Sequence, residues 1–250
     1  MRGEYEPLVA VYEWLVPDNL LEPEGAAAAF AQVLDGIPPP ARVLDCAAGT
    51  GQLAVGLALR GYEVVATDVS PGMVGRTRTL AGQHGVALRV EACAWADLGG
   101  AGLEPFDAVF CVGNSLTHAQ GTAGRRSALR AMRSVLRPGG LLAVTSRNWE
   151  LVRAAGSGLA LPSEVSVRNG IPGLTVLSWT IPPRWYEPHT VDVGVALLQG
   201  TAVTPHLSRL TFWPFTHDAL QQDLRACGFQ VRASSYGDSG DRYLVTATAD

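Results

Sequence analysis

Residues 43–73 read VLDCAAGTGQLAVGLALRGYEVVATDVSPGM and carry the clearest structural signal in the chain. A short apolar run ends at Asp45, a loop of small residues contains Gly49 and Gly51, and a second apolar run ends at Asp68. The order strand, Gly-rich turn, helix, strand, acid is half of a nucleotide-binding α/β unit. The glycines let the backbone approach a ligand closely, and the second acid stands where ribose hydroxyls are usually held.

The loop favours a positively charged nucleotide over a dinucleotide. A dinucleotide fingerprint has a third glycine that completes G-x-G-x-x-G, and the residues after Gly51 supply none at that place. Asp45, just before the loop, disfavours an anionic pyrophosphate. It suits a ligand with positive charge, such as the amino group and sulfonium of S-adenosylmethionine. A dinucleotide-binding oxidoreductase domain stays open as the alternative.

Composition describes a globular protein and argues against several other classes. With 250 residues, 47% apolar and 17% charged, the chain can bury a full core as one domain, residues 1–250. Its net charge of −4 gives no electrostatic reason to expect a nucleic-acid partner. The four cysteines are far apart and lack C-x-x-C spacing, so we expect no metal site and no disulfide framework.

The amino-terminal region is expected to be helical. It begins MRGEYEP, which is not a secretory signal, and no apolar run approaches the length of a membrane span. We therefore expect a cytoplasmic protein without a membrane partner. Residues 4–36 predict one or two helices that carry Tyr5, Tyr12 and Trp14, and residues 1–40 are interpreted as a helical lid.

Strands and helices alternate between residues 42 and 146. The expected strands are 42–46, 63–67, 86–92, 106–112 and 141–146, and the expected helices are 51–60, one starting at Ser70-Pro71, and 124–136. This alternation predicts an α/β fold with a doubly wound, parallel, Rossmann-like sheet.

The pattern changes after Trp149. Residues 150–210 are rich in Val, Thr, Gly and Pro and predict an antiparallel cap subdomain inserted into the domain. A helix over 215–227 follows, and then two strands over 229–234 and 243–248.

The loop from Asp45 to Gly51, with its spacing to Asp68 and Met73, resembles the class I S-adenosylmethionine-dependent methyltransferases. Their first motif reads acid-x-Gly-x-Gly-x-Gly, and this chain matches it with Ala47 at the first glycine. The resemblance implies a seven-stranded sheet whose last strand inserts antiparallel to its neighbours. It also implies S-adenosylmethionine as cofactor and S-adenosylhomocysteine as product.

A narrower resemblance covers residues 40–150. Gly113-Asn114-Ser115 and His118, followed by Arg147-Asn148-Trp149 after the fifth strand, are similar to the glycine and glycine-sarcosine N-methyltransferases. The resemblance implies that the loop contacts the methionine part of the cofactor and that Asp68 binds the ribose. Other residues would contact the base and the sulfonium. These cofactor-binding residues are Asp45, Ala47, Gly49, Gly51, Asp68, Met73, Ala94, Trp95, Val112 and Ser115.

The same resemblance implies the residues around the methyl acceptor. Asn114 and Arg147 would hold an amino acid, because a guanidinium suits a carboxylate through two parallel hydrogen bonds. A salt bridge for Arg147 and a backbone cap for Asn114 stay open as structural alternatives. His118 is interpreted as a general base, a supporting partner or a structural histidine.

The predicted function is methylation of a small molecule, directed at nitrogen in the leading hypothesis. Trp149 stands where the family has a tyrosine, and Phe212 and Trp213 replace a tyrosine pair, which predicts a more apolar acceptor pocket. An oxygen-directed enzyme that uses His118 as a base is the second hypothesis, and a non-catalytic protein that keeps the fold is the third. The sequence leaves the acceptor and any self-association of the chain open.

Overall fold

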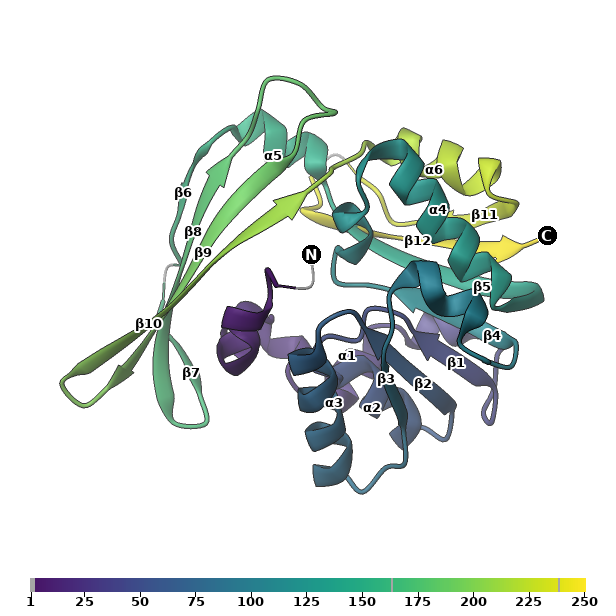
Figure 1. The fold of residues 1–250 in the computed structure, drawn as a ribbon, viewed down its shortest axis with the longest axis horizontal. Helices are drawn as coiled ribbons and strands as arrows, with labels where there is room; N and C mark the ends of the chain where they lie inside the picture. Colours follow the sequence, from purple (N-terminus) through teal and green to yellow (C-terminus); the bar gives the residue numbers. More distant parts are fainter. Residues whose placement is uncertain (1–2, 163, 238) are drawn as a thin grey trace.

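The structure, a computed structural model, describes residues 3–162, 164–237 and 239–250. Figure 1 shows two sheets that stand apart, with the amino-terminal segment between them. The larger sheet has seven strands in the order β11-β12-β5-β4-β1-β2-β3. Its strands are β1 (Arg42–Asp45), β2 (Glu63–Asp68), β3 (Arg89–Ala92), β4 (Phe106–Cys111), β5 (Leu136–Arg147), β11 (Phe229–Ser234) and β12 (Arg242–Ala249).

The fold class expected from the sequence is confirmed. Five neighbouring strands of this sheet are parallel, in the order β3-β2-β1-β4-β5. Strand β12 runs antiparallel to both β5 and β11. The strand order reverses between β1 and β4, and ligands bind in the crevice at such a point. The helices along this sheet are α2 (Gln52–Leu59), α3 (Pro71–Gln83), η4 (Trp95–Gly100), η5 (Ser115–His118), α4 (Gly121–Ser134) and α6 (His217–Ala226).

Two of these helices begin where their sequences predict. The Ser70 hydroxyl caps α3 by accepting a hydrogen bond from the Met73 amide at 3.1 Å, and Pro71 fits the first helical position because its missing N–H would be unpaired there. The Thr216 hydroxyl likewise caps α6 by accepting from the Ala219 amide.

Strand β5 begins earlier than expected. Leu136 already pairs with Phe106, and the regular ladder resumes only where Leu141 lies opposite Ala108. Residues 137–140 therefore form a bulge rather than the turn that Pro and Gly suggested. Strand β3, in contrast, begins three residues later than the expected 86.

The amino-terminal region is helical but is divided into short pieces. These are η1 (Glu6–Leu15), η2 (Asp18–Leu20), α1 (Pro23–Ala28) and η3 (Ala31–Leu34), of which only α1 is an α-helix. Pro7, Pro17 and Pro23 lie at the starts of the first three pieces. Because proline cannot donate a backbone hydrogen bond, each one prevents a longer helix from forming.

The second sheet is antiparallel and lies between β5 and α6 in the chain. The order β10-β9-β8-β6, with β7 also paired to β8, connects β6 (Gly158–Ala160), β7 (Ser166–Arg168), β8 (Ile171–Thr180), β9 (His189–Gln199) and β10 (Ala202–Phe212). Helix α5 (Trp149–Ala155) leads into it. The rings of Trp149 and Phe212 lie 5.3 Å apart. The excursion of residues 149–212 therefore leaves the larger sheet and returns to it at one place.

The segment η1 holds the two sheets together. Leu8, Val11 and Trp14 are buried against the inner face of β9. The Trp14 ring lies where a side chain on Gly173 of β8 would clash, since a Cβ there would be 2.3 Å from the ring. On the side of the larger sheet, Glu13 forms an ion pair with Arg76 of α3.

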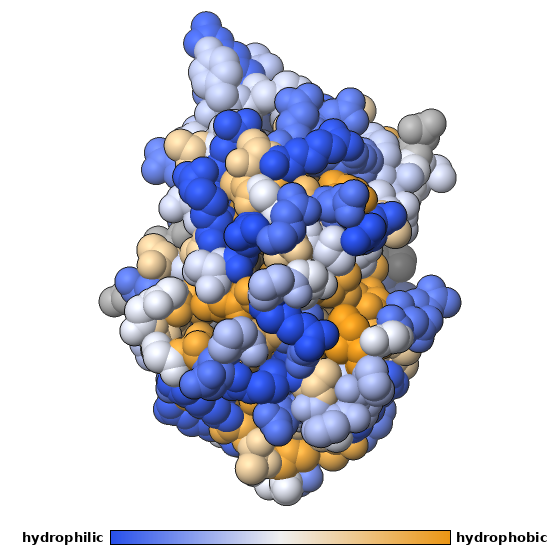
Figure 2. All heavy atoms as spheres, turned by 90° about the vertical axis from the view of Figure 1, so that its right-hand side faces the viewer, coloured by the Kyte–Doolittle hydropathy of each residue, from blue (hydrophilic) through white to orange (hydrophobic). Residues whose placement is uncertain are grey.

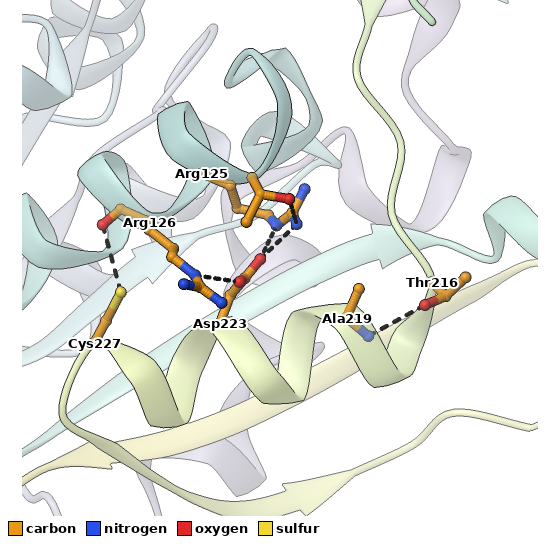
Figure 3. A network of polar contacts seen from close by, with 7 residues as sticks. Arg125, Arg126, Thr216, Ala219, Asp223 and Cys227 are labelled. Atoms are coloured by element: carbon orange, nitrogen blue, oxygen red, sulfur yellow. Dashed lines mark hydrogen bonds and ion pairs between the residues drawn. The ribbon is translucent and has the colours of Figure 1, made fainter. Parts of the chain in front are cut away.

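A buried charge network joins α4 to α6 (Figure 3). Asp223 is 2% exposed, and its two carboxylate oxygens accept hydrogen bonds from Arg125 at 2.5 Å and Arg126 at 2.6 Å. The Arg125 guanidinium, 4% exposed, also lies over the Phe215 ring at 4.7 Å. These contacts fix α6 on α4 beside the sheet.

Hydrophilic residues cover most of the face in Figure 2, and hydrophobic residues form smaller groups among them. In the described ranges of the chain, no helix has both the length and the apolar character that crossing a membrane requires.

Candidate functional site

A cavity of about 630 Å³ opens at the carboxyl ends of the central strands, beneath the amino-terminal segment. Its size lies within the usual range for small-molecule and cofactor sites. Eight of the thirteen residues that the sequence predicts for the site line this cavity. They are Ala47, Gly49, Asp68, Met73, Ala94, Trp95, Ser115 and His118.

The Gly-rich loop has the backbone geometry that its glycines allow. Gly49 and Gly51 have φ angles of +56° and +96°, which side chains other than glycine's rarely adopt. A Cβ on Gly51 would lie 2.8 Å from the Thr77 side chain of α3. The Thr77 hydroxyl donates to the Gly49 carbonyl at 2.9 Å, so α3 fixes the loop from behind. Gly51 thus shapes the loop without lining the cavity.

Asp68 presents a carboxylate to the cavity from the end of β2. Its two oxygens each accept one backbone hydrogen bond, from Gly49 and from Ser70, both at 2.9 Å. Burial raises the pKa of Asp68, and these amide donors oppose the rise. Each oxygen keeps accepting capacity for a ligand hydroxyl, which fits a cis-diol.

A second carboxylate lies beneath the loop. Asp45 is 1% exposed and does not line the cavity. Burial, its largest influence, raises the pKa of Asp45 to about 7, the Ala47 backbone amide opposes the rise, and the negative charge of Asp68 adds to it. Two carboxylates so close together favour a positively charged ligand beside the loop.

Small and aromatic side chains line the part of the cavity beyond Asp68. Met73 and Ala94 lie at its wall, and the indole N–H of Trp95 donates to the Cys46 carbonyl at 2.8 Å. This hydrogen bond fixes the Trp95 ring near the ends of β1 and β3. Ser115 also lines the cavity, whereas Val112 packs against the core under the sheet.

The side-chain oxygen of Asn114 has hydrogen-bond partners among the described residues, and its amide nitrogen has none. It has a φ of +71°, is 5% exposed, and does not line the cavity. Its Oδ1 accepts hydrogen bonds from the Arg147 backbone amide at 3.0 Å and from the Trp149 indole at 3.2 Å. No partner for its Nδ2 is found in the described parts of the chain, so this amide group keeps its donors.

The Arg147 guanidinium forms no ion pair with a described residue, although the negative charge of Asp241 acts on it and opposes the fall in its pKa. Within residues 3–162, 164–237 and 239–250, no carboxylate forms an ion pair with its guanidinium, which lies 5.6 Å from the Trp179 ring centre. Burial and the neighbouring Arg242 lower the pKa of Arg147 to about 10. Arg147 is not among the lining residues, but its charge opposes the rise in the pKa of the lining residue Tyr5. The charge of Arg147 thus acts on a residue of the cavity, although the side chain itself is not part of the lining.

His118 has both ring nitrogens engaged. Nδ1 lies 2.9 Å from the Thr211 carbonyl, which can only accept, so this nitrogen carries the proton. Nε2 lies 2.8 Å from the Tyr5 hydroxyl and accepts from it in the neutral ring. Burial lowers the pKa of His118, which keeps the ring neutral.

Several lining residues have no signal in the sequence that assigns them a role. Glu4 and Thr211 reach the cavity from opposite ends of the chain. Glu4 lies outside every sequence motif, whereas Thr211 stands directly before the aromatic pair Phe212-Trp213, which indicates this part of the chain but not Thr211 itself. Of the three aromatic replacements, only Trp213 lines the cavity, because Trp149 and Phe212 belong to the core under the second sheet.

Comparison with known proteins agrees with this geometry. A methyltransferase domain model matches residues 43–140. A glycine/sarcosine N-methyltransferase of Parasynechococcus marenigrum (strain WH8102) is 31% identical over 196 residues, which are 78% of this chain and 65% of that enzyme. The chain thus spans just under two thirds of this relative's length.

Solved structures share the whole fold. The CcbJ methyltransferase from Streptomyces caelestis has a TM-score of 0.80 at 20% identity, with complete coverage of both chains. CalS10, an amino pentose methyltransferase from Micromonospora echinaspora, has a TM-score of 0.75 at 22% identity over 96% of this chain and 95% of that one. Residues 43–140 of the chain thus match a methyltransferase domain, the chain is similar to a glycine/sarcosine N-methyltransferase, and its fold is shared by solved methyltransferase structures.

Proposed function

We propose that the protein transfers a methyl group from S-adenosylmethionine to the amine of an amino-acid-like small molecule. Arg147 carries the proposal, because a partly buried guanidinium with no ion-pair partner among the described residues suits an acceptor carboxylate. The Nδ2 donors of Asn114 support the same assignment. The name of the Parasynechococcus relative, which acts on glycine and sarcosine, points the same way.

The cavity fits the cofactor. When bound, S-adenosylmethionine supplies a methyl group on a positively charged sulfur. Asp68 would accept the ribose hydroxyls, Met73 and Trp95 would contact the base, and the loop at Ala47 and Gly49 would lie along the methionine part. The carboxylates of Asp68 and Asp45 would favour the cofactor's positive charge.

The protein's residues would then mainly align the acceptor amine with the methyl group of the cofactor. An amine with a neutral fraction attacks the methyl carbon without help from a strong base. Holding nucleophile and methyl in line supplies several kcal/mol of barrier reduction. Arg147 and Asn114 would fix the acceptor for this attack. We further propose that residues 1–40 act as a lid over the cavity and that the cap at 150–210 determines which acceptor binds. We also propose that the enzyme is cytoplasmic and binds neither nucleic acid nor membrane.

The test is calorimetry followed by an acceptor screen. Purified protein is titrated with S-adenosylmethionine and S-adenosylhomocysteine, and the absence of heat exchange would refute the proposal. Methyl transfer is then measured to a panel of amino acids and of amino sugars that lack a carboxylate. Transfer to amino acids is expected, and transfer to amino sugars alone would overturn the role of Arg147.

Asp68→Ala is expected to weaken S-adenosylhomocysteine binding by about 1–3 kcal/mol, the usual cost of leaving hydrogen-bonding partners unpaired. Calorimetry measures the change. Asp97→Ala serves as a control, because Asp97 follows Trp95 in η4 but does not line the cavity. Equal loss in both variants would contradict the assignment of Asp68.

His118→Ala distinguishes nitrogen-directed from oxygen-directed transfer. The Tyr5 hydroxyl already occupies the basic nitrogen of His118, so the ring is poorly placed to deprotonate an acceptor hydroxyl. Loss of this hydrogen bond, about 0.5–1.5 kcal/mol, should lower kcat/KM by about 2- to 12-fold. The shape of the pH profile should stay unchanged between pH 6 and 9. A loss of about 100-fold or more, with a changed pH profile, would instead favour a general base.

A further inference from the structure

Glu4 places a carboxylate in the cavity at its amino-terminal wall. The side-chain Oε2 accepts a hydrogen bond from the Thr211 backbone amide at 3.2 Å. The backbone carbonyl of Glu4 accepts a second hydrogen bond from the Ser208 hydroxyl. Both partners belong to β10, so the second sheet fixes the position of this carboxylate at the cavity.

The Glu4 carboxylate has no cationic partner in the described ranges of the chain. Its Oε1 has no hydrogen-bond donor within the same ranges. The charge of Glu4 adds to the rise that burial causes in the pKa of Tyr5, and it opposes the fall that burial causes in the pKa of His118. A carboxylate fixed at a cavity wall without a cationic partner leaves one oxygen free to accept a hydrogen bond from a ligand.

The two unpaired charges beside the cavity are opposite in sign. Tyr5 lies close enough to Glu4 and to Arg147 for its pKa to respond to both. The cavity wall therefore carries the Glu4 carboxylate, whereas the Arg147 guanidinium is outside the lining and acts on Tyr5 through its charge. This arrangement is complementary to a ligand that carries an amine next to a carboxylate.

We propose that Glu4 binds the amine of the methyl acceptor, opposite the carboxylate held by Arg147. The proposal rests on the proposed function. As the nitrogen lone pair forms the N–C bond, the C–S bond breaks and its electrons leave with sulfur as a neutral thioether. The positive charge moves from sulfur to nitrogen, and the Glu4 carboxylate stabilises it there.

The test uses two cofactor analogues, so it does not need the natural acceptor. Sinefungin has a protonated amine where the cofactor has its transferred methyl, whereas S-adenosylhomocysteine has neither the methyl nor the charge. Calorimetry measures both on the wild type, on Glu4→Gln, and on Glu24→Gln, which removes an exposed charge on α1. Glutamine keeps an oxygen for the Thr211 amide, and thermal melting checks that each variant folds.

Glu4→Gln is expected to weaken sinefungin about 10-fold, as for a lost hydrogen bond to a charged group, and S-adenosylhomocysteine less than 2-fold. Glu24→Gln should change neither affinity. Glu4→Asp, which keeps the charge but withdraws it by one methylene, should lie between the wild type and Glu4→Gln. Unchanged sinefungin binding in both Glu4 variants would overturn the assignment of Glu4 alone. If the wild type bound neither analogue, the proposed function itself would fail.

Discussion

Asp223→Ala is expected to lower the free energy of unfolding by about 3–5 kcal/mol, because it leaves the buried Arg125 guanidinium without its anion. Arg126, which is partly exposed, can turn toward water, but Arg125 is only 4% exposed and cannot. Urea denaturation followed by circular dichroism measures the change. Because α6 is held on α4 through this carboxylate, the loss should spread to the whole domain.

Asp192→Ala is the matched control, since Asp192 also accepts two hydrogen bonds from one arginine, Arg209. Both partners are exposed on the second sheet, so water screens the pair and its removal should change stability little. A similar loss in the Asp223 and Asp192 variants would show that burial of the network contributes little.

Arg147→Ala is expected to raise the KM of the acceptor by about 10- to 150-fold, which corresponds to about 1.5–3 kcal/mol for a hydrogen bond to a charged group. Affinity for S-adenosylhomocysteine should stay almost unchanged. Steady-state kinetics with the acceptor found in the screen and calorimetry with S-adenosylhomocysteine separate the two effects.

Arg184→Ala provides the control, because Arg184 is an exposed arginine that precedes β9. It should leave both quantities unchanged. If Arg147→Ala weakened acceptor and cofactor equally, Arg147 would belong to the cofactor site, and its assignment to the acceptor would be wrong.

The conformation of the Gly-rich loop and its contact with Asp68 could be predicted because their geometry is local. Gly49, Gly51 and Asp68 belong to one strand-turn-helix-strand unit, and the backbone conformation of the turn follows from residue type. Helix starts at Ser70 and Thr216 follow from capping chemistry in the same way. In each case the deciding contacts lie within about 30 residues in the chain.

The acceptor half depends on contacts between distant segments. Glu4 meets Thr211 across 207 residues, and Tyr5 meets His118 across 113, and no spacing rule connects such pairs. The lack of an ion pair at Arg147 among the described residues likewise depends on how distant segments fold together. The bulge before Leu141 escaped prediction because its partner strand, not its own Pro and Gly, determines where β5 begins.

The touching rings of Trp149 and Phe212 have a consequence for the history of such enzymes. An excursion that departs and returns at one point can be exchanged for another sheet at a single junction. A laboratory chimaera joined at these two residues must also reproduce the packing of the present sheet on η1 and the hydrogen bonds of β10 to Glu4 and His118. The second sheet and the amino-terminal segment are therefore expected to have been inherited together.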